Sequence, residues 1–152
     1  MMSKRLIFLW LLCSFIIFSC KKDEPQKSNR DYLVEKACWR IKAFEVKDEV
    51  TGVYSDITYS ILQQECKRDN CFRFYKDGKY EENEGQTKCK SSDLDIVASG
   101  NWSLSADNRT ITIITEGKTS EVTISSINGI KLITEGAVHI LSGIVPVRIT
   151  YE

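Results

Sequence analysis

The sequence predicts an all-β protein, a small antiparallel up-and-down barrel of about eight or nine strands. From Val34 onward, short runs of β-branched and aromatic residues alternate with turn pairs, and helical periodicity is weak. The turn pairs Asp77-Gly78, Asp107-Asn108 and Asn128-Gly129 tolerate the positive φ angles that tight hairpins need. Because the connections between runs are short, an up-and-down barrel fits better than a sandwich.

The chain begins with a pattern typical of exported lipoproteins. Lys4 and Arg5 precede an apolar run, Leu6–Phe18, which is too short to span a bilayer comfortably. Ser19 and Cys20 follow, and a charged segment comes next. The pattern resembles a bacterial lipoprotein signal, with cleavage before Cys20 and lipid on its sulfur. We therefore expect residues 1–19 to be a signal peptide, the alternative being an ordinary secretory signal or a membrane anchor.

Residues 20–33 are expected to form a lipidated, flexible tether. The segment Lys21–Asp31 is polar and charged, and its composition is typical of a linker. Within it, Lys22, Asp23 and Glu24 resemble the tag that sends lipoproteins to the outer face of the outer membrane. The expected location is thus the outer membrane, lipid-anchored and at the cell surface, the alternative being a generic charged linker.

Residues 34–152 are long enough for one domain with one core. After loss of Lys4 and Arg5 with the signal, 19 basic residues face 21 acidic ones, a net charge of −2. No basic excess or cluster is available for phosphate groups, so we expect no nucleic-acid partner. The membrane is the expected contact, through the lipid, and we expect a monomer.

The turn at Asp107-Asn108 allows its flanking strands to be aligned. A two-residue loop there places Trp102 opposite Ile113 and Leu104 opposite Ile111, on one apolar face.

A second hairpin, a closing strand and two short helices are also expected. The same alignment around Asn128-Gly129 pairs Ile127 with Ile130 and Ile124 with Ile133. Alternating apolar residues in 145–151 predict a closing strand. Short helices are expected within Asp56–Gln64 and Asp31–Lys36, the latter over one end of the barrel.

Four cysteines remain in the domain, an even number in an oxidising compartment, which favours disulfides over a metal site. A two-residue loop at Asp77-Gly78 places Cys66 opposite Cys89, and a three-residue loop with a bulge places them one residue apart. We therefore expect a Cys66–Cys89 disulfide, which leaves Cys38 and Cys71 as the second pair. The alternatives are Cys38–Cys66 with Cys71–Cys89, or free Cys38 and Cys71.

The chain resembles the lipocalin-like lipoproteins of Bacteroidota over about Val34 to Ile133. The likeness rests on the ordered segments Cys66-Lys67-Arg68-Asp69-Asn70, Phe72, Phe74, Asp77-Gly78-Lys79-Tyr80, Glu84-Gly85, Cys89, Gly100-Asn101-Trp102-Ser103-Leu104-Ser105 and Thr110-Ile111-Thr112-Ile113. Members typically open with Gly-x-Trp, where this chain has Ala37-Cys38-Trp39. The resemblance implies a small meander barrel but no established chemistry, because many members have no assigned ligand.

A barrel of this size can hold one small apolar ligand if its own side chains do not fill it. The inward face is expected to include Trp39, Phe72, Phe74, Tyr80, Trp102, Leu104, Ile111 and Ile113. Of these, Trp39, Phe74, Tyr80 and Trp102 are the proposed ligand-binding residues. The alternatives are that these residues form a solid core, and that the protein is a structural or interaction lipoprotein that docks to a cell-surface complex.

No catalytic constellation is evident in the sequence. The sole histidine, His139, has no nucleophile elbow or metal-site pattern around it. Acid pairs such as Asp93/Asp95 and Glu81/Glu82 are explained by solvated loops and strand edges. We therefore expect neither an enzyme, nor a cofactor, nor a bound metal.

Overall fold

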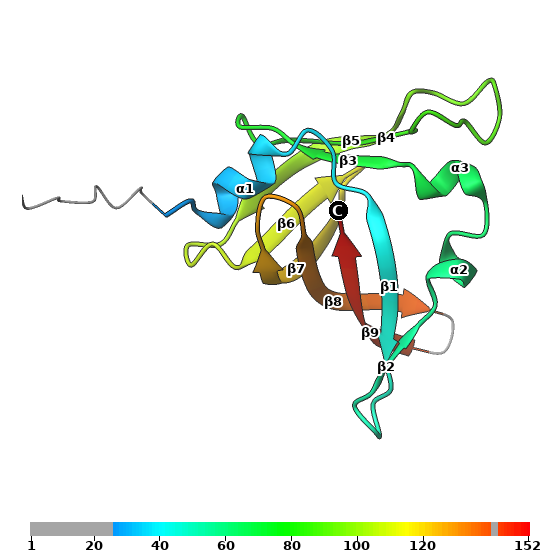
Figure 1. Cartoon of the computed structure of the whole chain (residues 1–152). Helices are drawn as coiled ribbons and strands as arrows, with labels where there is room; N and C mark the ends of the chain where they lie inside the picture. The colour runs from blue at the N-terminus through cyan, green and yellow to red at the C-terminus, as the bar shows by residue number, and fades with distance from the viewer. Residues whose placement is uncertain (1–25, 141–142) are drawn as a thin grey trace, which may run out of the picture.

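The computed structural model describes residues 26–140 and 143–152. In these residues, nine strands form one antiparallel sheet in the order β2-β1-β9-β8-β7-β6-β5-β4-β3 (Figure 1). The strands are β1 Ile41–Lys47, β2 Tyr54–Asp56, β3 Cys71–Phe74, β4 Lys79–Asn83, β5 Ile96–Leu104, β6 Thr110–Thr115, β7 Lys118–Ile127, β8 Leu132–Ile140 and β9 Gly143–Tyr151. The helices are α1 Asn29–Glu35, α2 Thr58–Ile61 and α3 Glu65–Arg68. The predicted all-β meander is confirmed.

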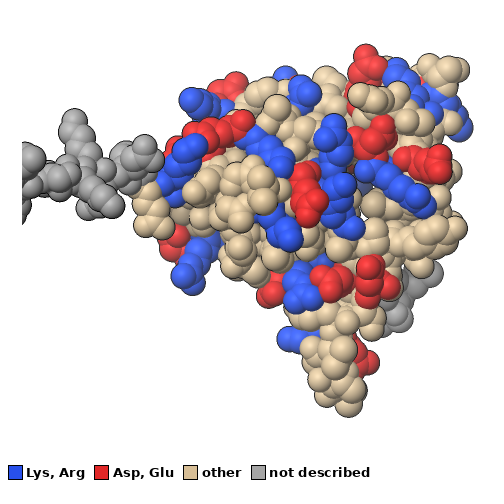
Figure 2. All heavy atoms as spheres, in the orientation of Figure 1, with Lys and Arg blue, Asp and Glu red and all other residues tan. Residues whose placement is uncertain are grey.

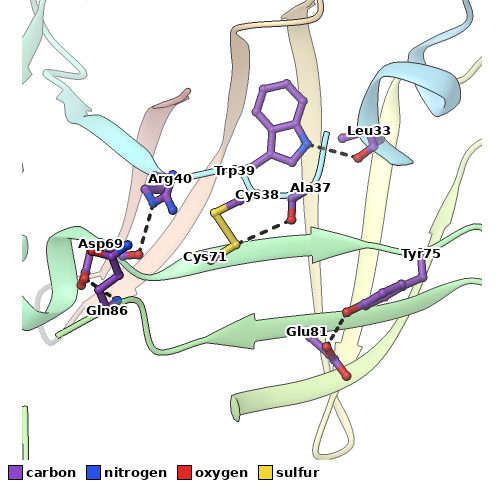
Figure 3. The surroundings of a disulfide bond; sticks show 10 residues. All are labelled: Leu33, Ala37, Cys38, Trp39, Arg40, Asp69, Cys71, Tyr75, Glu81 and Gln86. Carbon is purple, nitrogen blue, oxygen red and sulfur yellow. Dashed lines mark hydrogen bonds between the residues drawn. A yellow bond between two sulfur atoms is a disulfide. The ribbon is translucent and has the colours of Figure 1, made fainter. Parts of the chain in front are cut away.

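The sheet curls until its two ends meet at a single point. Trp39, just before β1, and Phe72, in β3, exchange two backbone hydrogen bonds of 3.0 and 2.9 Å. The Cys38–Cys71 disulfide joins the residues next to this bridge, as Figure 3 shows. Elsewhere in the described chain, no ladder connects β1 to β3. The barrel is therefore joined at this seam and splayed apart beyond it.

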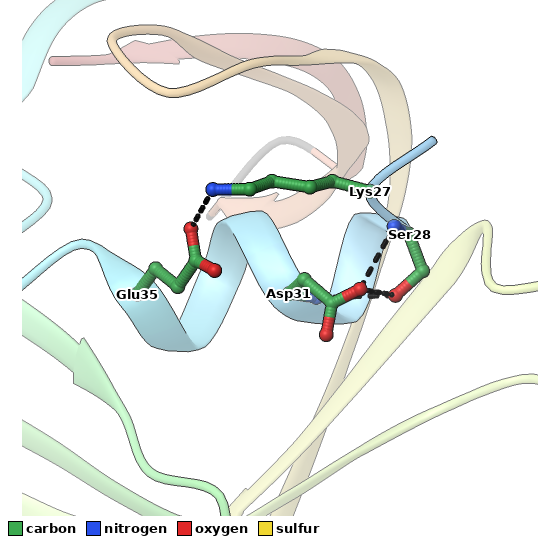
Figure 4. Close-up of polar contacts among 4 residues, drawn as sticks. All are labelled: Lys27, Ser28, Asp31 and Glu35. Atoms are coloured by element: carbon green, nitrogen blue, oxygen red, sulfur yellow. Dashed lines mark hydrogen bonds and ion pairs between the residues drawn. The ribbon is translucent and has the colours of Figure 1, made fainter. Parts of the chain in front are cut away.

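Helix α1 covers the end of the barrel where the 75–78, 105–109 and 128–131 connections lie, which we call the closed end (Figure 1). Its N-terminus is a capping box, because Ser28 and Asp31 each accept from the other's backbone N–H (Figure 4). Leu33 on its inner face is fully buried, and its carbonyl accepts a 3.2 Å hydrogen bond from the Trp39 indole. Residues from Asn29 on thus belong to the packed domain and not to the expected 20–33 tether.

The main core lies under α1. Its largest buried aromatic side chain besides Trp39 is Trp102, which donates from Nε1 to the Tyr75 carbonyl at 2.9 Å. The Phe74 ring meets the Trp102 ring edge-on at 5.3 Å between centroids. The buried members are Leu33, Trp39, Phe74, Tyr80, Trp102, Ile111, Ile124 and Leu132. Five of the eight residues expected on the inward face belong to this core, and the other three, Phe72, Leu104 and Ile113, pack against it.

Of the two hairpin registers aligned from Asp107-Asn108 and Asn128-Gly129, the structure confirms one and contradicts the other. The 107–108 hairpin is confirmed, with Trp102 opposite Ile113 and Leu104 opposite Ile111. The 128–129 alignment is wrong, because Ile127 faces Leu132 and a bulge follows Ile124.

The different register at residues 128–129 is explained by Asn128. Its Oδ1 accepts from the N–H groups of Ile130 and Lys131 at 2.9 and 2.8 Å, and its backbone N–H donates to the Lys131 carbonyl at 2.9 Å. Asn128 therefore faces Lys131, and the turn lies at Gly129-Ile130 instead of Asn128-Gly129. A turn at Asn128-Gly129 would not pair Asn128 with Lys131 in this way.

At Asp77-Gly78 the structure selects the three-residue loop, with Phe74 opposite Tyr80. Gly78 has a φ of 88°, which favours glycine. Both expected disulfides, Cys38–Cys71 and Cys66–Cys89, are confirmed among the described cysteines, and the alternative pairings are excluded. Cys66 lies in α3 and not on an extended strand, because β3 begins only at Cys71.

Several expectations fall on residues outside those described. These are the signal peptide, lipid attachment at Cys20 and the export tag Lys22, Asp23 and Glu24. Within the described ranges, no helix has the length and apolar character needed to cross a membrane. The core cluster, both disulfides and every strand partner lie after residue 26, so the segment 26–152 holds all the contacts described for the fold.

Candidate functional site

Opposite the closed end, α2 and α3 lie at what we call the open end (Figure 1). Side chains from this segment, from β1 and from β3 to β5 surround a cleft there. The cleft has a volume of about 360 Å³, within the range of small-molecule sites. It is lined by Ile41, Ile61, Leu62, Lys67, Asn70, Phe72, Glu82, Glu84 and Val97. Its walls thus combine five apolar side chains with four that carry charge or amide groups.

A smaller space, the inner cavity, lies deeper in the barrel. Its volume is about 50 Å³, and its lining residues are Phe72, Phe74, Tyr80, Ile111, Ile113, Val122, Leu132, Thr134 and Tyr151. Phe72 borders both spaces, so the cleft and the inner cavity adjoin at this ring. An apolar group entering from the open end would therefore meet the apolar interior at Phe72.

Two broader hollows lie elsewhere on the described surface. One of about 670 Å³ lies between β1 and the α2–α3 segment, and one of about 590 Å³ lies where β7 and β8 diverge. The first shares no lining residue with the inner cavity. The second shares only Val122 and includes the exposed His139. We take the cleft as the candidate site, because it borders the inner cavity at Phe72 and its lining includes the buried polar residue Asn70.

The wall of the cleft is held in place by its covalent and polar connections. The Cys66–Cys89 disulfide fastens α3 to the loop that follows β4. The Oδ2 atom of Asp69 accepts from the backbone N–H groups of Gln86 and Thr87 at 2.7 and 2.9 Å. A Cβ atom at Gly85 would lie 2.3 Å from Asp69, so only glycine allows this close approach. These connections position the segment that carries Glu84.

Three polar side chains converge in the cleft. Asn70 precedes β3 and donates from Nδ2 to Oε1 of Glu82 at 3.3 Å. Glu82 lies on β4 opposite Phe72, and Glu84 follows two residues later. Asn70 is only 9 % exposed, and its Oδ1 atom and Oε2 of Glu84 are buried without a hydrogen-bond partner in the described structure. The cleft therefore contains acceptors that lack donors.

The acidity of these groups follows from burial. Burial raises the pKa of Glu82 above its ordinary value, the Asn70 hydrogen bond lowers it, and repulsion from Glu84 raises it again. Burial also raises the pKa of the Tyr80 phenol, and it raises that of Tyr151 to about 12. Both phenols therefore stay neutral at physiological pH. In the described part of the chain, no ion pair joins the Glu82 carboxylate to a Lys or Arg side chain.

The structure divides the four predicted ligand-binding residues into two groups. Phe74 and Tyr80 line the inner cavity. Trp39 and Trp102 are buried in the core under α1 and border neither the cleft nor the inner cavity.

Sequence reasoning missed Asn70, Glu82 and Glu84 as site residues. The sequence around Asp77-Gly78 did contain an indication for Glu82. In the three-residue register, Glu82 falls on the same face of β4 as Tyr80 and opposite Phe72, which places a carboxylate on an apolar face.

A family model described as a lipocalin-like domain matches residues 36–133. The chain belongs to the lipocalin-like domain family. The matched segment runs from just before the seam at Trp39 to the start of β8, so it includes every strand from β1 to β7. No curated protein matches the chain.

The surface of this lipocalin-like domain has no strong single sign of charge on the face in Figure 2, where basic and acidic side chains are interspersed. A ligand of either charge would thus be selected by groups within the cleft and not by a field over that face. In the described residues, no three His, Cys, Asp or Glu side chains are grouped as they would be to hold a metal ion.

Proposed function

We propose that this protein is a lipid-anchored binding protein, and not an enzyme, that takes a small, mainly apolar ligand through its open end. The observation that carries the proposal is that the cleft borders the inner cavity at Phe72, whose side chain lines both spaces. Small-molecule sites are typically concave and mostly apolar, with a few placed polar groups, and barrel mouths are a common place for them. The closed end, filled by α1 and the tryptophan core, serves as the floor.

The test is a matched pair of substitutions on neighbouring strands. Val97 lines the cleft and is 48 % exposed, whereas Ile114 is 45 % exposed and borders none of the described hollows. Val97→Trp should narrow the cleft and weaken binding of the apolar fluorophore N-phenyl-1-naphthylamine, while Ile114→Trp should leave binding unchanged. Equal effects of both, or no fluorophore binding by the unaltered protein, would refute the proposal.

The anchor is a second part of the proposal and rests on the N-terminal sequence pattern. Lipid on Cys20 would hold the domain at the outer membrane, and Lys22, Asp23 and Glu24 would direct it to the cell surface. Cys20→Ser should abolish lipid attachment and membrane retention. Protease added to intact cells should cleave the domain. Normal retention of the variant refutes the anchor, and an uncleaved domain refutes surface display.

A further inference from the structure

We propose that the ligand's head group is a protonated amine, held by Asn70, Glu82 and Glu84 while its apolar part points toward Phe72. This inference rests on the proposed binding function and names the chemical class of ligand. Asn70 comes from the residue just before β3, Glu82 from β4 and Glu84 from the loop after β4, and all three line the cleft. An amine provides hydrogen-bond donors together with positive charge, and the cleft offers acceptors together with negative charge.

The first observation is Asn70. Its side chain is more than nine-tenths buried and lines the cleft, and its one hydrogen bond uses Nδ2 as the donor to Glu82. The Oδ1 acceptor has no donor among the described residues. Buried polar groups are nearly always paired, and exceptions often mark the place of a missing partner. The missing partner here is a donor, which an amine supplies and a carboxylate does not.

The second observation is the arrangement of the two carboxylates. Glu82 and Glu84 are two residues apart and repel each other, which contributes to the raised pKa of Glu82. Neither forms an ion pair with a described Lys or Arg, although the structure contains such pairs elsewhere, for example Lys79 with Glu81. Oε2 of Glu84 is also buried without a donor in the described chain. A cation between these carboxylates would satisfy both.

Lys67 is the remaining charged side chain in the lining. It lies on α3, across the cleft from β4, and no described ion pair joins it to Glu82 or Glu84. With one lysine and two glutamates, the lining has an excess of one negative charge when all are ionised. The charge complement is a monocation, and an anionic head group would face two like charges and only one opposite charge.

The test compares three ligands that share a chain and differ in the head group. Octylamine, octanol and octanoate are titrated at neutral pH into the segment 26–152 by calorimetry, after circular dichroism has established that the segment is folded. The amine should bind about tenfold more tightly than the alcohol, as expected for one charge-assisted hydrogen bond in a partly buried site. Glu82→Gln should reduce the amine's affinity to near that of the alcohol and leave the alcohol's affinity unchanged.

Glu49→Gln is the matched control, because Glu49 is exposed in the β1–β2 connection and borders none of the described hollows. It should alter no affinity. Equal binding of all three ligands, or preference for octanoate, would overturn the head-group assignment and leave the binding function standing. Failure of every ligand and of N-phenyl-1-naphthylamine to bind would refute the binding function itself.

Discussion

Replacement of Trp102 by alanine should remove a large part of the stability of the domain. The side chain is 4 % exposed, its ring packs edge-on against Phe74, and the Arg30 guanidinium lies 4.8 Å from its centroid. Its indole N–H also donates to the Tyr75 carbonyl. Truncation of a buried tryptophan costs about 3–5 kcal/mol, since the lost burial is accompanied by a cavity. Domains of this size are stable by about 5–15 kcal/mol, so the loss is a large fraction of the total.

The assay is urea unfolding followed by far-ultraviolet circular dichroism, which does not depend on tryptophan emission. With an m-value of about 2 kcal/mol/M, a loss of about 4 kcal/mol lowers the midpoint by about 2 M. Trp102→Phe keeps most of the ring and removes the indole donor. Because the Tyr75 carbonyl also accepts from the Gly78 N–H, this variant should lose only about 1 kcal/mol.

Tyr59→Ala is the control, because this aromatic side chain is 76 % exposed and its removal should change stability by less than about 0.5 kcal/mol. If Trp102→Ala lowers the free energy of unfolding by less than about 1 kcal/mol, Trp102 is not a main contributor to the stability of the core. If that small loss came with loss of fluorophore binding, Trp102 would be part of the ligand site and the division between core and cleft would be wrong.

Three further predictions concern the seam, α1 and the cleft. Replacing both Cys38 and Cys71 by serine should cost about 3–4 kcal/mol in the chain-entropy model for a disulfide that spans 33 residues, and hydrogen exchange should show faster amide exchange at the adjacent backbone bridge than in β8. Ser28→Ala should cost about 1 kcal/mol in urea unfolding, because the Asp31 N–H loses its acceptor. For Glu82, the raised pKa means that its stabilising contribution is present below the ordinary value of 4.5 and is lost as the pH rises through the raised value. Glu82→Gln should therefore melt at a higher temperature than the unaltered protein at neutral pH, and the difference should shrink on acidification.

The elements set by local chemistry could be predicted from the sequence. The 107–108 hairpin alternates apolar and polar residues over 101–104 and 110–113, so its register followed from the position of the turn. The Cys66–Cys89 pair was predicted from an extended hairpin, yet it links α3 to a loop. The pairing was right because both cysteines lie similar distances from the same turn, which brings them together whether or not the strands continue.

The elements that depend on tertiary contacts could not be predicted from the sequence. The 128–131 connection depends on hydrogen bonds that the Asn128 Oδ1 accepts from the Ile130 and Lys131 N–H groups, and these compete with a turn at Asn128-Gly129. The beginning of α1 was placed too late because Lys21–Asp31 has linker composition, whereas Leu33 gains its burial only once the barrel end exists. Asn70 was missed for the same reason, since its unpaired Oδ1 exists only in the folded cleft.

The most direct measurement of ligand binding is native mass spectrometry of the domain purified without detergent. The unaltered protein should carry or take up one small apolar amine. Val97→Trp, which narrows the cleft, should give a much smaller fraction of amine-bound protein. A protein that stays at its unliganded mass before and after incubation with octylamine would contradict the proposal that the cleft binds an apolar amine. The open end would then have to be interpreted as a surface for another macromolecule.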